Sequence, residues 1–160
     1  MGDLTNVGKK AESKIREWLD KPEEGFWLYR IPDQQTGFFG SNNPCDFFLY
    51  RMPNFYLIES KATYEDRFSF NMISPNQHEK MLKAAETSGV TSYVAVLFAS
   101  YQRMFLLNIR DIAGSERVGK KSLNIKKIDK WNLPYIEVRT IPSRKQLLDY
   151  DFKHAKEIFR

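Results

Sequence analysis

The sequence is poor in the residues that build disulfides and Cys/His metal centres. It contains one cysteine, Cys45, and two histidines, His78 and His154, among 160 residues. One cysteine excludes an internal disulfide and a thiolate zinc site, and two histidines disfavour a metal cage of imidazole ligands. Cys45 itself is best interpreted as a small core residue in a strand.

Long apolar segments are missing as well. The longest apolar run, residues 93–99, is far shorter than the roughly 18 residues that a membrane-spanning helix needs. The N-terminus has no apolar region of the signal-peptide type. We therefore expect an intracellular, cytoplasmic protein with no membrane partner.

The composition offers enough apolar material for one core and an excess of positive charge. Hydrophobic residues make up 42% of the chain and aromatic residues 14%, and a chain of this length buries about 70% of its unfolded surface. No repeat, low-complexity segment or linker divides it, so we expect residues 1–160 to form a single domain. The formal net charge of +5 allows a polyanionic partner without establishing one.

The most informative stretch, residues 44–61, is typical of a β-hairpin. Two runs rich in aromatic and aliphatic residues, 45–50 and 55–58, flank four residues with turn composition. If those four residues form the loop, Tyr50 faces Phe55 on the neighbouring strand.

That register brings charged side chains together. Counting back along both strands sets Asp46 opposite Glu59, and Lys61 falls on the same face because side chains repeat every two residues. Two facing carboxylates, with Cβ atoms about 4.5–5.5 Å apart, repel each other unless something neutralises them. Mg²⁺ prefers such oxygen ligands together with water, and a neighbouring lysine could hold a phosphate or the attacking water. The alternative is an exposed hairpin end with a Glu–Lys pair, and the hairpin alone does not decide between the two.

The other elements mix helices and strands. The pattern predicts a helix over residues 6–19, a strand over 26–31, a loop over 33–44, a helix from Ser74 to Ser88, strands over 93–98 and 104–109, a short strand within 135–140, and a terminal helix containing Leu147, Tyr150, Phe152, Ala155 and Ile158. The first helix has an apolar stripe of Leu4, Gly8, Ala11, Ile15 and Trp18, surrounded by Lys9, Lys10, Lys14 and Arg16. This order predicts an α/β fold with helices on both faces of a mixed central β-sheet.

Two polar side chains on these helices have more than one interpretation. Glu12 could form an i,i+4 pair with Arg16, worth only about 0.3–0.5 kcal/mol, or project into the acidic cluster as a further carboxylate. The helix alone favours the pair. Ser74, Pro75 and Gln77 form a capping box, which explains Gln77 completely in structural terms.

Two further segments carry features suited to nucleic acid. Residues 63–71 contain Arg67, which could contact a sugar-phosphate backbone, and aromatic residues that could stack on unpaired bases. Phe68 and Phe70 are better interpreted as core anchors. The lysines and arginines of residues 111–160 are compatible with a phosphate-contacting surface, although a solvated charged face is the usual reason for them.

Several motifs in the correct order resemble those of a known nuclease family. Pro44-Cys45-Asp46 followed by Glu59-Ser60-Lys61 resembles the P-D…(D/E)-x-K signature of the restriction-endonuclease-like superfamily. Asn6-Val7-Gly8 with Glu12, and residues 68–77 followed by Met81, are similar to successive motifs of the RecU-type Holliday junction resolvases. The similarity involves most of residues 1–110.

The resemblance implies a restriction-endonuclease-like fold and a metal-dependent, structure-selective DNA endonuclease. Asp46 and Glu59 would ligate Mg²⁺, for which Mn²⁺ is expected to substitute. Lys61 would support the nucleophilic water, and Glu12 and Gln77 would complete the site. This implication reverses the preference given above for Glu12.

The family further implies a homodimer that cuts two opposed strands of a four-way junction, a branched DNA. We assign DNA contacts to Lys9, Lys10, Arg67, Phe38 and Phe39. Larger relatives carry a long projecting insertion before the aspartate, where this chain has only residues 33–43. Phe38 and Phe39 are equally compatible with a small wedge in the junction and with packing on their own subunit. The alternatives are a less selective nicking or restriction-type endonuclease and a non-catalytic DNA-binding module on a nuclease scaffold.

Overall fold

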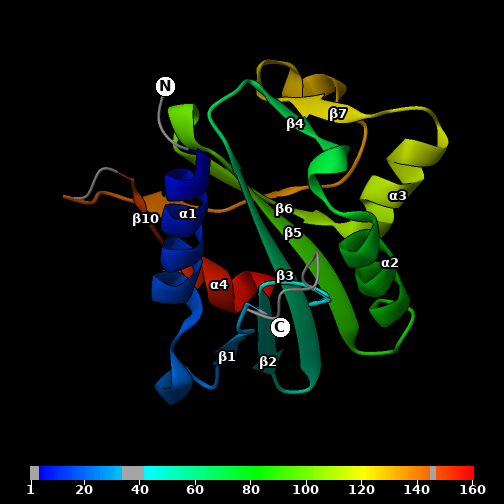
Figure 1. Cartoon of the computed structure of the whole chain (residues 1–160). Helices are drawn as coiled ribbons and strands as arrows, with labels where there is room; N and C mark the ends of the chain where they lie inside the picture. Colours follow the sequence, from blue (N-terminus) through cyan, green and yellow to red (C-terminus); the bar gives the residue numbers. More distant parts are fainter. Residues whose placement is uncertain (1–3, 34–41, 145–146) are drawn as a thin grey trace.

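The chain folds into a twisted mixed sheet with helices on both sides (Figure 1). The computed structural model describes residues 4–33, 42–144 and 147–160. Its helices are α1 (Leu4–Leu19), α2 (Pro75–Ala84), α3 (Ile109–Arg117) and α4 (Phe152–Ile158). Its strands are β1 (Trp27–Arg30), β2 (Phe47–Arg51), β3 (Asn54–Thr63), β4 (Arg67–Ser69), β5 (Val90–Phe98), β6 (Arg103–Asn108), β7 (Ser122–Asn124), β8 (Ile136–Glu137), β9 (Thr140–Ile141) and β10 (Asp149–Tyr150). No helix in these ranges is long and apolar enough to cross a membrane.

The main sheet has six strands in the order β1-β2-β3-β5-β6-β8. All neighbours are antiparallel except β3 and β5, which run parallel because α2 forms the crossover between them. The predicted central strand, β5, has β3 on one side and β6 on the other, and its residues from Val94 to Phe98 are buried. The predicted mixed sheet is therefore confirmed.

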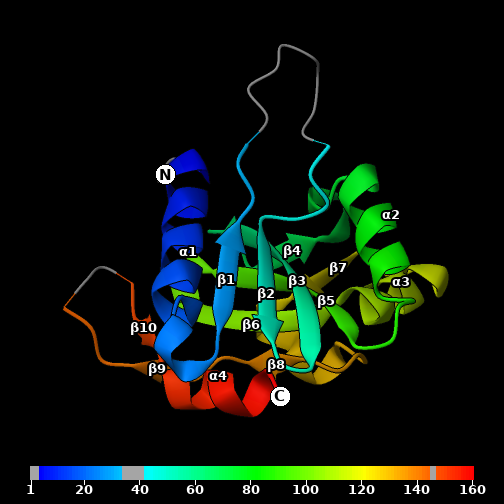
Figure 2. The ribbon, with the colours of Figure 1, turned by 90° about the horizontal axis from the view of Figure 1, so that it is seen from below.

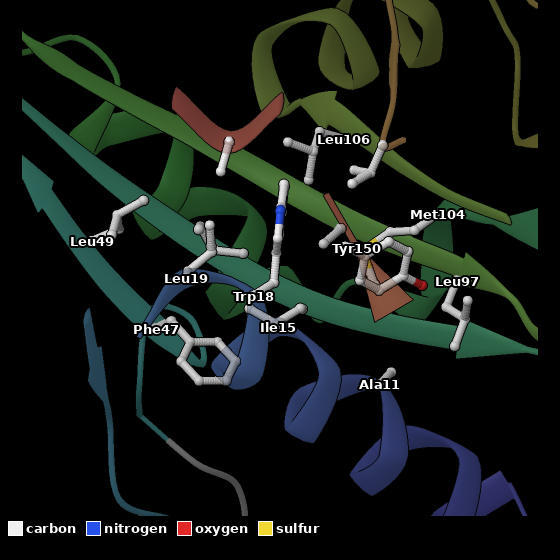
Figure 3. Close-up of a cluster of buried hydrophobic side chains, with 14 of the residues drawn as sticks. Ala11, Ile15, Trp18, Leu19, Phe47, Leu49, Leu97, Met104, Leu106 and Tyr150 are labelled. Atoms are coloured by element: carbon white, nitrogen blue, oxygen red, sulfur yellow. The ribbon is translucent and has the colours of Figure 1, made fainter. Parts of the chain in front are cut away.

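Each face of the sheet has its own apolar core. On one face, α1 and α4 cover inward side chains of β2, β5 and β6, and Figure 3 shows Ile15 and Trp18 of α1 in this core. On the other face, Met81 of α2 and Ile112 of α3 pack with Leu57, Val94 and other residues of the sheet. Burial of a large apolar side chain contributes about 1.5–3 kcal/mol, so the two cores fix the helices against the strands that carry the charged residues.

Several elements differ from the sequence expectation. Lys14 is buried rather than solvated, and its ammonium pairs with Asp149 on β10. Cys45 is buried, as expected, but precedes β2 instead of lying in a strand. The helix α3 was not expected at all. It begins directly after β6, where the side chain of Asn108 caps the helix by accepting from the Arg110 N–H at 3.0 Å.

The remaining differences concern boundaries. The second helix ends at Ala84, before the expected Ser88, and a turn with Gly89 at φ 78° leads into β5. The 135–140 segment contains β8 and the start of β9. The terminal helix is only α4, with Leu147 and Tyr150 buried ahead of it.

Candidate active site

The predicted hairpin register is confirmed. Tyr50 lies opposite Phe55, and the pairing continues back to Phe47 opposite Ile58. β2 and β3 also pair one residue further toward the turn than expected, at Arg51 and Asn54. The next pair beyond Phe47 and Ile58 would be residues 46 and 59.

Asp46 lies just before β2, where its carbonyl oxygen accepts from the Ile31 N–H at 2.8 Å and two contacts with β3 hold it. Its N–H donates to the Ile58 carbonyl at 3.2 Å, and its Oδ2 accepts from the Ser60 N–H at 2.8 Å. The second contact fixes the carboxylate against β3, beside Glu59. The electrostatic effect of Asp46 on the pKa of Glu59 reflects this proximity.

Glu59 is a buried carboxyl group, 2% exposed. Its Oε1 accepts from Lys61 Nζ at 2.8 Å and from Gln77 Nε2 at 2.8 Å. Its Oε2 is buried and has no hydrogen-bond partner among the described residues. Burial, and then the charge of Asp46, raise the pKa of Glu59 to about 7, against the opposing effects of Lys61 and Gln77.

Gln77 both caps α2 and bonds Glu59. Its backbone N–H donates to Ser74 Oγ at 3.2 Å and its Oε1 accepts from the Ser74 N–H at 3.3 Å, which completes the predicted capping box. Its Nε2 simultaneously reaches Glu59, and Lys61 Nζ lies 3.4 Å from its Oε1. The start of α2 therefore orients the buried carboxylate of β3, because the two ends of one amide face different partners.

Glu12 joins the acidic cluster through Arg30, a residue that sequence reasoning missed. Arg30 Nε donates to Glu12 Oε2 at 3.0 Å, and Arg30 Nη2 lies 2.9 Å from the same oxygen and 3.9 Å from Asp46 Oδ1. Burial and then the charge of Asp46 raise the pKa of Glu12, whereas Arg30 lowers it. No ion pair joins Glu12 to Arg16 within the described residues, so the pair favoured from the helix alone is wrong.

The signal for Arg30 was weak in the sequence. The one local ion-pair partner of Arg30 among the described residues is Asp33, 3.3 Å away, and it does not point to the site, since Glu12 and Asp46 are each more than fifteen positions away along the chain. The pairing of β1 with β2 brings Arg30 beside Asp46, and the packing of α1 on the sheet adds Glu12.

The carboxylate pair fits a hard divalent cation. Asp46 and Glu59 supply oxygen ligands, which Mg²⁺ and Mn²⁺ favour, and the unpartnered Glu59 Oε2 is a buried acceptor that costs roughly 1–3 kcal/mol when left unsatisfied. Within residues 4–33, 42–144 and 147–160, no three His, Cys, Asp or Glu side chains are grouped to hold one ion. A cation here would therefore depend on two carboxylates, with water or a phosphate oxygen completing its ligands.

Three of the five residues assigned to DNA contact lie within the described part of the chain. Lys9 is exposed and Lys10 partly exposed on α1, the helix that carries Glu12. Arg67 is exposed on β4 and donates to Ser122 Oγ at 3.2 Å. Phe38 and Phe39 lie outside the described residues.

Phe68 and Phe70 are 0% and 3% exposed, which confirms the interpretation of both side chains as core anchors. Arg67 is thus the side chain of that segment that remains available to a phosphate.

A family model and a solved structure are similar to this chain. The model of RecU, recombination protein U, matches residues 29–150. The structure of Hjc from Archaeoglobus fulgidus, described as a Holliday junction resolvase from an archaeal hyperthermophile, is similar with a TM-score of 0.50 and 19% identity. The match covers 74% of this chain and 89% of that chain, which shows a shared restriction-endonuclease-like fold. No curated protein sequence matches significantly.

The family match includes the strand that carries Arg30, the hairpin with Asp46, Glu59 and Lys61, and the start of α2 with Gln77. These elements carry every residue of the cluster except Glu12, whose helix α1 precedes the matched residues. The chain therefore belongs to the RecU family of Holliday junction resolvases, which are metal-dependent endonucleases.

Proposed function

We propose that this chain is a Mg²⁺-dependent resolvase that acts as a homodimer and makes paired cuts in four-way DNA junctions. The observation that carries the proposal is the buried Glu59 carboxylate beside Asp46, with one oxygen unpartnered and the other bonded to Lys61. A purely structural Glu–Lys pair would gain nothing from a second carboxylate at its side, because like charges at facing positions destabilise a sheet.

In this proposal Asp46 and Glu59 hold the metal through their carboxylate oxygens. A bound Mg²⁺ supplies positive charge next to the scissile phosphate and lowers the pKa of a coordinated water. Mn²⁺, which takes the same kind of ligand, is expected to substitute.

The remaining side chains orient the carboxylates and the water. The Lys61 ammonium lies 2.8 Å from Glu59, where it can hold the attacking water or neutralise charge on the phosphate. Gln77 fixes the rotamer of Glu59 through its 2.8 Å bond. Glu12 and Arg30 set the charge beside Asp46. Attack by water on phosphorus would break the P–O3′ bond, and the departing 3′ oxygen would take up a proton from solvent, which gives a 5′-phosphate and a 3′-hydroxyl.

Contacts with DNA are assigned to three basic and two aromatic residues. Lys9, Lys10 and Arg67 would neutralise backbone phosphates, and Phe38-Phe39 would act as a small wedge in the junction centre. Residues 1–160 would work as one nuclease domain, since the two cores share the same sheet. In this proposal the enzyme works in the cytoplasm, on intracellular DNA.

One gel tests the proposal against its alternatives. Labelled four-way junction, flap and linear duplex are incubated with the protein in Mg²⁺, in Mn²⁺ and in chelator. We expect paired, symmetry-related cuts in the junction with either metal and none in chelator. Equal cutting of linear duplex would favour the less selective nuclease, and binding without cleavage in either metal would favour the non-catalytic module.

A second prediction separates DNA binding from catalysis. In chelator, Asp46 presents negative charge to a phosphate, so Asp46→Asn should bind junction DNA at least as tightly as the parent. Asparagine keeps an oxygen that can accept from the Ser60 N–H. Binding isotherms from about 50 to 200 mM salt should show a steep loss of affinity for both proteins, because phosphate neutralisation releases counterions.

The matched control for this measurement is Asp129→Asn, an exposed aspartate outside the site. A roughly tenfold fall in the affinity of Asp46→Asn with the fold intact would mean that Asp46 is structural rather than a metal ligand.

A further inference from the structure

The excess positive charge of the chain is concentrated in one short segment. Residues 117–130 contain six lysines and arginines and one aspartate, which gives this segment a net charge of +5. The whole chain also has a formal net charge of +5, so the remaining residues carry equal numbers of charges of each sign. Basic residues gathered in one place are the electrostatic footprint of a surface that binds nucleic acid.

The segment is a folded part of the protein surface. Ile125 and Trp131 are buried, 4% and 2% exposed, and Trp131 Nε1 donates to the Asn124 carbonyl at 2.8 Å. Lys120 Nζ donates to the Lys130 carbonyl at 3.1 Å, which closes the two ends of the segment on each other. The backbone that carries the basic side chains is therefore ordered before any partner binds, which lowers the cost of binding.

Arg67 on β4 belongs to the same surface. β4 pairs with β7 so that Arg67 lies opposite Asn124, and the Arg67 guanidinium donates to Ser122 Oγ at 3.2 Å. Next to it, Lys126 Nζ lies 2.7 Å from Asp66 Oδ2. Asp66 thus neutralises Lys126, and this ion pair fastens the basic segment to the start of β4.

Four other cations of this surface are exposed, and we call them the basic platform: Arg67, Lys121, Lys127 and Lys130. Within the parts of the chain that the structure describes, no ion pair joins any of the four to a carboxylate. Asp129 is the one acidic residue of 117–130. A polyanion gains affinity by neutralising exposed cations of this kind, because counterions are released.

The surroundings of the basic platform suit the backbone of duplex DNA. Ser69, Ser122 and Asn124 alternate with buried residues on β4 and β7, and hydroxyl and amide groups commonly accompany cations at phosphates. The one aromatic residue of 117–131, Trp131, is 2% exposed, so unpaired bases find no ring to stack on there. A single strand is therefore a poorer fit than a duplex.

The basic platform lies beyond the end of the strand that carries the carboxylate cluster. β3 has Glu59 and Lys61 near its C-terminal end and leads directly to β4, and Figure 1 shows β4 and β7 beyond that end. Lys61 and Arg67 are six positions apart, so their Cα atoms are separated by at most about 22 Å. Duplex DNA spans about six base pairs in that length, roughly half a helical turn.

We infer that the basic platform binds the backbone of one duplex arm of the branched DNA, within about one helical turn of the scissile phosphate. The inference rests on the proposed function for the identity of the DNA, but the contact itself needs neither metal nor cleavage. It adds Lys121, Lys127 and Lys130 to Arg67, the one residue of this surface assigned above to DNA contact.

Two triple variants with the same change in net charge test the contact in chelator. The platform variant combines Lys121→Gln, Lys127→Gln and Lys130→Gln. The control variant changes a lysine after α1 and two lysines of α4, in the combination Lys21→Gln, Lys153→Gln and Lys156→Gln. Figure 2 shows α4 on the other side of the sheet from α2 and α3, whose core contains the buried residues of β4 and β7.

Junction binding is measured as a function of salt for the parent and both variants. Each neutralised phosphate contributes about 0.9 to the slope of log affinity against log salt, so the platform variant should lower this slope by about two to three units. Its Kd at about 0.1 M salt should rise at least about tenfold. The control variant should change the slope by less than about one unit and Kd by less than about threefold.

A photocrosslinker identifies the part of the DNA that lies on the platform. Native Cys45 is 1% exposed, and burial raises the pKa of its thiol to about 12, so azidophenacyl bromide will label only an introduced cysteine. Labelled Lys127→Cys should crosslink to one duplex arm within about a helical turn of the cut. Labelled Lys153→Cys, on α4, should give less than about a tenth of that yield.

The outcomes separate this inference from the proposed function. A platform variant that keeps the circular dichroism, salt slope and Kd of the parent would overturn the inference, whatever the cleavage assay gives. Crosslinks from position 127 to the branch point alone would overturn the assignment to an arm. Platform-dependent binding by a parent that cuts no DNA in Mg²⁺ or Mn²⁺ would support the inference and contradict the proposed function.

Discussion

Asp46→Asn, Glu59→Gln and Lys61→Ala should each lower the single-turnover rate of junction cleavage in Mg²⁺ by a factor of roughly 10²–10⁴. The first two replace a charged carboxylate, the proposed metal ligand, by a neutral amide, and losing several kcal/mol of transition-state stabilisation corresponds to that range. Lys61→Ala removes the ammonium that lies 2.8 Å from Glu59. Rates are measured on a labelled four-way junction with enzyme in excess.

Two further variants calibrate this result. Gln77→Ala should lower the rate only about 10–100-fold, because in the proposal Gln77 orients Glu59 and does not itself bind the metal; helix capping is lost as well. Glu157→Gln changes an exposed carboxyl group on α4 and should cut like the parent. Near-parental activity in Asp46→Asn, Glu59→Gln and Lys61→Ala together would refute the assignment of the site.

In chelator, the free energy of unfolding of the parent should fall relative to Glu59→Gln as the pH rises from about 4.5 to about 7. The raised pKa means that the native state binds more protons than the unfolded state in this window, so stability decreases with pH. In total the parent loses about 3 kcal/mol of unfolding free energy, and the loss is complete above the pKa of Glu59 in the native state. At pH 8, therefore, Glu59→Gln should be the more stable protein.

Urea unfolding at several pH values between 4 and 8 measures this difference. Adding Mg²⁺ should reverse the order at pH 8, because the cation stabilises only the protein that retains both carboxylates. Glu157→Gln should follow the parent throughout. A difference between parent and Glu59→Gln that stays constant from pH 4 to pH 8 would show that burial does not perturb Glu59.

The sequence by itself determined the part of the site that lies on one hairpin. The positions of Asp46, Glu59 and Lys61 follow from a turn and from two-residue alternation, and both are local properties. The start of α2 was equally readable, because Ser74 and Gln77 complete a capping box within four residues. The long apolar run of β5 likewise identified the strand at the centre of the sheet.

The tertiary structure alone decided which distant side chains complete the cluster. Glu12 pairs with Arg30 instead of Arg16 because α1 packs across the sheet, and that contact outweighs a surface i,i+4 pair of a few tenths of a kcal/mol. Gln77 reaches Glu59 because the crossover from β3 to β5 sets α2 beside the buried carboxylate. Lys14 is buried because Asp149 on β10 lies against α1, a contact between residues 135 positions apart in the chain. Such pairings depend on how layers pack, which local spacing does not encode.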